Sequence, residues 1–476
     1  MTKKGITAII AVAACAGGAS AHTTAGPIGG WRGTAQLRAP GGQEPFAISV
    51  EVRRGRAVVS LGAGHPARSV VPARISRNRV RFSLPGRPAL AFDGRVERGR
   101  LSGTFRQGAL RGRFRLRRGR PIEGASIAVY RFTDGSPLGI FSGFGPRVAV
   151  RHESGEIRAL YLTRPGTYAI GAGAATKNPS IGTAVFRADH VVWRGERAVR
   201  VPVRQEEVLV RSGRAFLACT LSVPPGQGRR PALTFAHGAG PAPRAFNLTL
   251  ASYANHLGLV TLSCDKRGVA QSGGDYPGEF PSTPAVDEYA TDVQVQARWL
   301  AAQAEVDPAR VGVAGGSQAG WIMPLAAARE PAIRFMIGLV SPSLTVGETD
   351  LWADLNGHGS SMPTRTEEDM EAEVRRAGPS GVDPMPSMWA MRIPAIWLYG
   401  GKDRTVPSRL CVERLDPLTR EPGRDFSYRV FPGGTHGLIL TANGLQAEAA
   451  ASNRLVEGLY PTIRDWLRAR GFSAIS

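Results

Sequence analysis

The sequence predicts an α/β domain in its C-terminal half, preceded by two small and mainly antiparallel β domains. Apolar and polar residues alternate with period two near the N-terminus, short strand-like runs follow, and continuous apolar runs then alternate with helical patterns. With 476 residues, 42% of them hydrophobic, the chain is long enough for several domains and too apolar to be disordered. The predicted segments are a signal peptide at 1–21, β domains at 28–120 and 121–205, and an α/β domain at 206–476 with an insertion at about 343–392.

The first residues are typical of an export signal. Lys3 and Lys4 precede an apolar run at 6–14 that is too short to span a bilayer, and an A-x-A cleavage pattern ends at Ala21. The alternative is a lipobox ending at Cys15, which would leave that cysteine acylated. In both cases we expect export to the periplasm or the extracellular space, and no transmembrane helix.

The first β domain combines alternation with an excess of arginine. Phe114 and Leu116 stand between Arg113, Arg115 and Arg117, which predicts a strand with one buried face. Residues 31–120 hold 21 arginines and four acidic residues, so the chain's net charge of +22 should concentrate on the outer face. This charge favours loose association with anionic envelope components. An arginine-biased composition explains it equally well, and without interleaved exposed aromatic residues we expect no specific nucleic-acid binding.

The remaining strands are predicted from short apolar runs. In the second β domain, where no helix of useful length fits, these runs are 127–130, 148–150, 159–162, 183–186 and 191–193. In the α/β domain they are 232–235, 259–262, 311–314, 335–340, 395–399 and 426–431. Continuous apolar strands that alternate with helices indicate a mostly parallel sheet covered on both faces. One of these helices presents an apolar face formed by Val286, Tyr289, Val293, Ala297 and Leu300.

Four cysteines are too few and too scattered for a disulfide scaffold. Cys219 and Cys264 lie in apolar strand-like runs, where buried free thiols are common, and at most one bridge can form if export removes Cys15. No Cys or His pair has the spacing of metal ligands. We therefore expect no metal and no other cofactor.

A candidate nucleophile lies where a strand runs into a sharp turn and a helix. Ser317 follows Gly315 and Gly316 and precedes Ala319 and Gly320, and these small residues allow the tight turn that exposes a serine hydroxyl. The pattern departs from G-x-S-x-G because Ala319 stands where the second glycine is usual. The preceding strand and the following helix strengthen the assignment.

Two further residues complete a catalytic triad in chain order. Asp403 follows the strand at 395–399, and His436 follows the strand at 426–431. The carboxyl ends of parallel strands are where such sheets bind ligands. A serine hydroxyl needs an imidazole to accept its proton, and a carboxylate to orient that imidazole. The expected oxyanion donors are the backbone N–H groups of Gln318 and Ala239, while His237 is expected to be structural.

The stretch from about residue 208 to the C-terminus resembles the α/β-hydrolase superfamily, and most of all bacterial serine esterases. The matching blocks are His237-Gly-Ala-Gly-Pro241, Asp265-Lys-Arg-Gly268 and Gly315-Gly-Ser-Gln-Ala-Gly320. The resemblance implies that Ser317, Asp403 and His436 are catalytic, and that Asp265 and Arg267 hold a loop rather than react. The acidic residues that usually follow the first block are absent from this chain.

The function expected from these residues is hydrolysis of small carboxylic esters through an acyl-enzyme, by an exported enzyme. A serine peptidase of the same fold is an alternative, although no paired glutamates in a suitable position offer an anchor for a peptide terminus. A second alternative is an envelope protein that binds polyanions and carries a vestigial hydrolase domain. Apolar side chains that could line the pocket, or belong to the core instead, are Trp321, Met323, Trp352, Met362, Met385, Met388 and Trp389.

Overall fold

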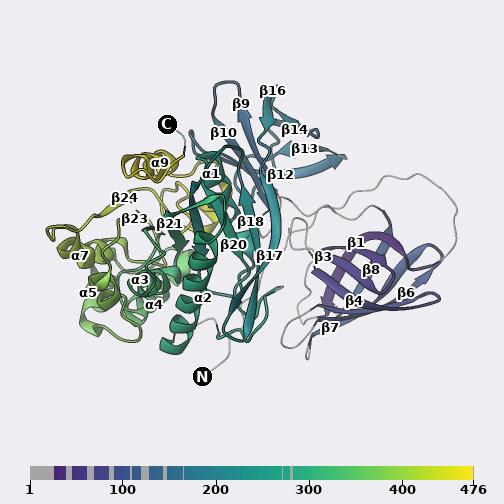
Figure 1. Cartoon of the computed structure of the whole chain (residues 1–476), viewed down its shortest axis with the longest axis horizontal. Coiled ribbons are helices and arrows are strands. Elements are labelled where there is room, and N and C mark those ends of the chain that lie inside the picture. The colour runs from purple at the N-terminus through teal and green to yellow at the C-terminus, as the bar shows by residue number, and fades with distance from the viewer. Residues whose placement is uncertain are drawn as a thin grey trace. The chain divides into compact units, whose positions relative to one another are not determined.

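A computed structural model describes residues 26–38, 46–61, 69–84, 90–107, 110–119, 128–142, 147–164, 166–270, 272–278 and 282–474 (Figure 1). The predicted signal peptide, its cleavage site and Cys15 lie outside these residues. The chain forms two compact units, of which the first comprises residues 1–126, 141–148 and 160–169, and the second comprises the rest. Within the described ranges, no helix combines the length and the apolar character that crossing a membrane requires.

The first β domain is a closed antiparallel barrel of eight strands in sequence order, with β1 paired to β8. Inward-facing residues form an apolar core in which the rings of Phe82 and Phe92 stack 4.9 Å apart and Trp31 is fully buried. The predicted alternation is therefore confirmed. The strands are β1 (Gly29–Arg38), β2 (Phe46–Arg53), β3 (Arg56–Leu61), β4 (Ser69–Ser76), β5 (Arg79–Leu84), β6 (Leu90–Glu97), β7 (Arg100–Gln107) and β8 (Leu110–Arg118).

The outer face of this barrel carries arginines in register across neighbouring strands. Phe114 and Leu116 of β8 are buried, and the arginines between and beside them are exposed. Arg117 of β8 lies opposite Arg100 of β7 on one side and opposite Arg32 of β1 on the other, and all three are exposed. Like charges directly opposite each other on a sheet are destabilising. The fold retains this row despite that cost.

The second β domain is also a closed eight-stranded barrel. Its described residues contain no helix, as predicted. It contacts the α/β domain through His152, whose buried ring stacks on Tyr253 at 5.0 Å and meets the edge of Tyr460 at 4.6 Å. The strands are β9 (Ala128–Phe132), β10 (Pro137–Ser142), β11 (Arg147–Arg151), β12 (Glu156–Arg164), β13 (Thr167–Ile170), β14 (Gly182–Phe186), β15 (His190–Trp193) and β16 (Glu196–Arg200).

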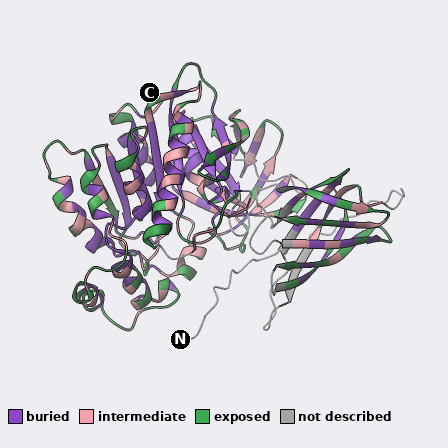
Figure 2. Ribbon diagram, turned by 60° about the horizontal axis from the view of Figure 1, so that its bottom comes forward, coloured by how far each residue is buried: buried purple, intermediate pink, exposed green. Residues whose placement is uncertain are grey.

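The α/β domain contains an eight-stranded sheet in the order β17-β18-β20-β19-β21-β22-β23-β24. Strand β18 runs antiparallel to its two neighbours, β17 and β20, and the strands from β20 to β24 run parallel to one another. Figure 2 shows that the strands of this sheet are mostly buried. The strands are β17 (Arg204–Ser212), β18 (Ala215–Val223), β19 (Arg230–Ala236), β20 (Val260–Cys264), β21 (Val306–Gly316), β22 (Phe335–Leu339), β23 (Ala395–Gly400) and β24 (Phe426–Phe431).

Helices connect and cover these strands. The side chain of Ser282 caps the first turn of α2 by accepting a hydrogen bond from the Ala285 N–H, and the apolar face predicted for this helix is buried. The helices outside the insertion are η1 (Arg244–Asn247), α1 (Leu248–His256), α2 (Thr283–Ala301), α3 (Ala319–Arg329), α7 (Ser408–Thr419), α8 (Gln446–Ala451) and α9 (Leu459–Ala469).

The predicted insertion between β22 and β23 is helical. It contains α4 (Val346–Leu355), η2 (Gly357–Gly359), α5 (Glu367–Ala377) and α6 (Met385–Ala390), and a capping box of Thr345 and Glu348 begins α4. Five of the seven proposed pocket-lining side chains are buried in the core, and the other two, Met362 and Trp389, are 53% and 44% exposed. The structure therefore supports the assignment of the five to the core.

The cysteine count allowed one bridge, and the structure contains that bridge in place of two free thiols. Cys219 of β18 and Cys264 of β20 lie directly opposite each other on adjacent antiparallel strands and form a disulfide. Their apolar surroundings suit a buried bridge as well as they suit free thiols, so composition alone could not distinguish the two. Cys411 is a buried free thiol.

Candidate active site

Ser317 occupies the sharp turn between β21 and α3. Its φ angle is +56°, a left-handed conformation that residues other than glycine rarely adopt and that is common at functional sites. The neighbouring backbones are too close for larger residues. A Cβ atom added to Gly315 would lie 2.6 Å from the Ala236 carbonyl oxygen, and one added to Gly320 would lie 2.6 Å from Cδ of Pro342. The tight packing thus holds the serine in its strained conformation.

Asp403 and His436 form a hydrogen-bonded pair at the ends of β23 and β24. The imidazole Nδ1 lies 2.9 Å from Asp403 Oδ2, so we assign the proton to Nδ1, which leaves Nε2 as an acceptor. The other carboxylate oxygen accepts hydrogen bonds from the N–H groups of Thr405, at 2.8 Å, and Val406, at 2.9 Å. The side chain of Asp403 is fully buried and that of His436 is one-third exposed. This arrangement orients the imidazole and keeps one face of it accessible.

The pKa of His436 results from two opposing effects. Burial disfavours the imidazolium and lowers the pKa, but the charge and the hydrogen bond of the Asp403 carboxylate raise it by more. The pKa of His436 therefore lies above the ordinary histidine value. The carboxylate thus makes the neutral imidazole a stronger base than an ordinary histidine in a buried site.

Ser317 lies at the same edge of the sheet as this pair, because β21, β22, β23 and β24 are adjacent and parallel. Among the residues that the structure describes, no hydrogen bond joins the Ser317 hydroxyl to His436. Such bonds are often long in unliganded enzymes and tighten when substrate binds. The structure thus brings the aspartate and the histidine into contact and places the serine at the same edge.

The loop after β19 lies against the serine turn. A Cβ atom added to Gly238 would lie 3.5 Å from Ser317 Cβ, so the backbone that carries the expected Ala239 donor is adjacent to the nucleophile. His237 is buried, and its Nε2 lies 2.7 Å from the Cys264 carbonyl oxygen. Burial lowers the pKa of His237 to about 4. A neutral imidazole bonded to the backbone suits the structural role expected for it.

Asp265 and Arg267 hold the loops around the site. Asp265 Oδ1 accepts hydrogen bonds from the backbone N–H of Arg244 at 2.8 Å and from its guanidinium Nε at 3.2 Å. Arg267 binds Asp292 on α2, with Nε 3.0 Å from Oδ2. Burial raises the pKa of Asp292, although its partner Arg267 opposes that shift. These buried pairs connect the loop after β20 to η1 and α2.

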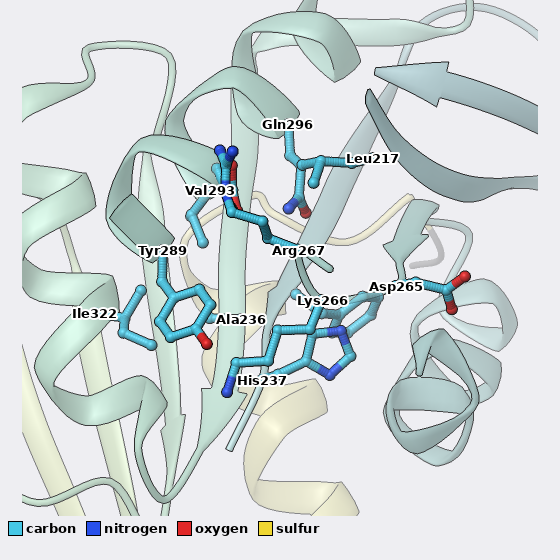
Figure 3. Close-up of a pocket in the computed structure, with 12 residues that line it drawn as sticks. Leu217, Ala236, His237, Asp265, Lys266, Arg267, Tyr289, Val293, Gln296 and Ile322 are labelled. Atoms are coloured by element: carbon cyan, nitrogen blue, oxygen red, sulfur yellow. The ribbon is translucent and has the colours of Figure 1, made fainter. Parts of the chain in front are cut away.

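Lys266, which lies between Asp265 and Arg267 in the sequence, was not among the predicted site residues. Lys266 is buried, and its ammonium group donates to the carbonyl oxygens of Gly238 at 2.9 Å and Gly240 at 3.3 Å, and to Gln318 Oε1 at 2.6 Å. Figure 3 shows Lys266 beside His237 and Tyr289 among the residues that line a pocket. The sequence did contain a signal for Lys266, because the chain has only five lysines and this one lies two residues after a buried strand.

The described part of the chain offers no group of three or more His, Cys, Asp or Glu residues that could hold a metal ion. The groups that the site offers are the Ser317 hydroxyl, the His436 imidazole, the Asp403 carboxylate and backbone N–H donors. Together these groups form the set that acyl transfer to a serine requires.

Comparisons with known proteins found matches to part of the chain. Residues 244–453 match the sequence model of the prolyl oligopeptidase family (Peptidase_S9). Uncharacterised proteins of two Mycobacterium tuberculosis strains, CDC 1551 / Oshkosh and ATCC 25618 / H37Rv, are 29% identical over 194 residues, which make up 40% of this chain and 58% of theirs. The chain thus spans little more than half the length of these curated relatives.

Two solved structures of esterases are similar to part of the chain. An esterase of Pyrococcus furiosus, 15% identical with a TM-score of 0.40, covers 56% of this chain and 91% of its own. A hyperthermophilic esterase of the archaeon Pyrobaculum calidifontis, 18% identical with a TM-score of 0.38, covers 57% and 88%.

Proposed function

We propose that this α/β hydrolase, preceded by two antiparallel β barrels, is an exported serine esterase that cleaves small carboxylic esters through an acyl-enzyme. The observation that carries the proposal is the Asp403–His436 pair, which lies at the same sheet edge as the strained Ser317. A hydrogen bond to a buried carboxylate fixes the tautomer that an accepting imidazole needs. The match to a hydrolase family supports the reaction class.

In the proposed reaction, Oγ of Ser317 attacks the ester carbonyl carbon while Nε2 of His436 takes the hydroxyl proton. The N–H groups of Ala239 and Gln318 then stabilise the negative oxygen of the tetrahedral intermediate. The bond to the alcohol breaks, and His436 protonates the departing alkoxide. Water repeats the same steps on the acyl-enzyme, which releases the acid and restores Ser317.

A serine peptidase is the second candidate, because the family that matches residues 244–453 is named for oligopeptidases. Esters remain the proposal because the sequence shows no paired glutamates positioned as an anchor for a peptide terminus. The two candidates share the triad and differ in the leaving group. Activity therefore has to be compared on both substrate types.

The experiment is a rate comparison on the purified protein. We expect turnover of p-nitrophenyl acyl esters, no turnover of aminoacyl p-nitroanilides, and covalent labelling of Ser317 by a fluorophosphonate. A panel of acyl chain lengths would define the substrate range. Faster cleavage of the nitroanilides would favour the peptidase, and failure of the fluorophosphonate to label Ser317 would contradict both candidates.

Export is supported by two independent features. The sequence begins with the predicted signal, and the Cys219–Cys264 disulfide is of a kind that forms and persists in oxidising compartments. In the same proposal, the exposed arginine row of Arg32, Arg100 and Arg117 attaches the protein loosely to anionic components of the envelope. Arginine suits this role because it remains charged at any physiological pH.

A further inference from the structure

The ammonium group of Lys266 contacts both backbone segments that carry the expected oxyanion donors. One segment is the loop after β19, where Lys266 binds the carbonyl oxygens of Gly238 and Gly240 on either side of Ala239. The other is the first turn of α3, where it binds the side chain of Gln318. An ammonium group has three N–H donors, and these three oxygens match that number.

The bond to Gly238 determines the direction of the Ala239 N–H. The carbonyl of Gly238 and the N–H of Ala239 belong to one planar peptide unit, and in a trans peptide they point in opposite directions. The cis peptide bond of the described chain lies elsewhere, at Asn178-Pro179. Because the Gly238 oxygen points at the buried lysine, the Ala239 N–H points away from it. A rotation of this peptide would remove the donor and break the bond to Lys266 together.

The surroundings of Lys266 hold its ammonium group in place. The group lies 4.4 Å from the centroid of the Tyr289 ring and 5.7 Å from that of Tyr276, which are cation–π distances. Tyr289 belongs to α2, which packs on the sheet. A buried charge is stable only when it is compensated by hydrogen bonds or charges, so the bonds to the loop and to α3 are difficult to give up. The lysine therefore acts as a rigid connection between the two segments.

We propose that Lys266 is a positioning residue of the oxyanion hole, which orients the Gly238–Ala239 peptide and Gln318 and places a positive charge behind the developing oxyanion. This inference rests on the proposed acyl transfer at Ser317. A group that stabilises charge present only in the transition state raises kcat and leaves substrate binding largely unchanged. The role thus differs from that of a residue that only stabilises the fold.

The experiment compares Lys266→Met with Gln296→Leu, a matched control. Gln296 belongs to α2 and is buried in the wall of the same pocket, outside the loop after β19. Its Oε1 accepts a hydrogen bond from Thr234 at 2.8 Å. We expect Lys266→Met to slow fluorophosphonate labelling of Ser317 and to lower kcat on esters, each by about 10- to 100-fold, with KM within threefold. We expect Gln296→Leu to stay within twofold of wild type in both measurements. Lys266→Arg, which retains the charge and the donors, should label faster than Lys266→Met.

Thermal unfolding of each variant shows whether the variant is folded, so that a loss of activity can be told from a loss of structure. If Lys266→Met has no cooperative transition, Lys266→Gln replaces it and must show at least a tenfold loss of kcat. Labelling and kcat within twofold of wild type in a folded variant would overturn the role of Lys266, while labelling of wild-type Ser317 would leave the esterase proposal standing. An equal loss in Gln296→Leu would also overturn it. Wild-type protein that is not labelled would contradict the proposed function and this inference with it.

Discussion

The catalytic sheet and the first barrel place their charged residues in opposite ways. At the edge of the sheet, Asp403, Lys266 and Arg267 are buried, and each is held by specific hydrogen bonds. In the barrel the core is apolar, and arginines cover the outer face in register. Buried charge needs a partner of defined geometry, whereas exposed charge tolerates many partners. The sheet thus holds its charges in a defined geometry, whereas the barrel presents its charges to solvent.

The largest effect is expected from removal of the proposed nucleophile, which should affect the sheet and leave the barrel unchanged. Ser317→Ala should lower ester turnover by about 10³- to 10⁶-fold, as loss of a triad serine does in other enzymes. Binding to anionic vesicles should be unchanged, because the barrel arginines are not involved. Steady-state kinetics and vesicle sedimentation measure the two effects. A variant that keeps more than a tenth of wild-type activity would remove Ser317 from the mechanism.

Substitution of Asp403 tests its proposed role as the acid of the triad. Asp403→Asn should reduce turnover by about 10⁴-fold, as the same change of a triad aspartate does in a serine protease. If Asp403 served only as a turn residue, asparagine would be nearly as good and activity would change little. Near-wild-type hydrolysis by this variant at neutral pH would leave the catalytic acid unassigned.

The pH dependence of kcat/KM tests whether Asp403 raises the pKa of His436. The pKa of His436 is raised, and catalysis needs the neutral imidazole, so wild-type kcat/KM should fall as the pH drops through a midpoint above 6.5. Without the carboxylate, only the lowering effect of burial remains. The midpoint for residual activity of Asp403→Asn should therefore move to lower pH. An unchanged midpoint would mean that Asp403 does not set the pKa of His436.

The disulfide of the sheet is expected to have a smaller effect, on stability. It closes a loop with a sequence separation of 45 residues, for which loop-closure entropy predicts a stabilisation of about 4 kcal/mol. The double variant Cys219→Ala with Cys264→Ala should lower the free energy of unfolding in urea by up to that amount. Cys411→Ala is the control, since that thiol is unbridged. Reaction of Cys219 and Cys264 with a thiol reagent in denatured, unreduced protein would show that the bridge is absent.

The smallest expected effect concerns the barrel surface. Arg32→Gln, Arg100→Gln and Arg117→Gln together should weaken binding to phosphatidylglycerol vesicles at low salt by up to about 100-fold, because each charge near such a surface contributes about 1 kcal/mol. Ester turnover should not change. The control carries the same charge change at exposed positions of the α/β domain, Arg376, Arg420 and Arg468. Equal binding by the two triple variants would assign the attraction to net charge alone.

Periodicity predicted most of the fold. The six runs predicted for the α/β domain became β19 to β24. Those inside the sheet are apolar because strands buried on both faces must be, whereas the edge strand β24 is partly exposed. The strand β17 was not predicted, since its edge position exposes Leu209 and mixes charged with apolar residues. Closure of the two barrels depends on pairing between distant strands such as β1 and β8, which local patterns do not contain.

The candidate site could be predicted in part. Three strand ends, each with one reactive residue, indicated Ser317, Asp403 and His436, and the structure brings Asp403 and His436 into contact. The bonds of Lys266 depend on how the loop after β19 meets the turn before α3, and those segments are distant in sequence. Pairing of Cys219 with Cys264 likewise depends on the register of β18 against β20.

Because the barrel surface carries arginines, pH and salt should act on different properties of the protein. A guanidinium stays protonated throughout the physiological pH range, whereas His436 is a titratable imidazole whose pKa lies above the ordinary histidine value. Acidification would therefore stop hydrolysis while the protein stays attached to a fixed anionic surface. Salt would do the reverse, because it screens exposed charge over about 10 Å at 0.1 M and leaves a buried hydrogen-bonded pair largely untouched. Ionic strength would then control attachment to the anionic surface, and pH would control hydrolysis.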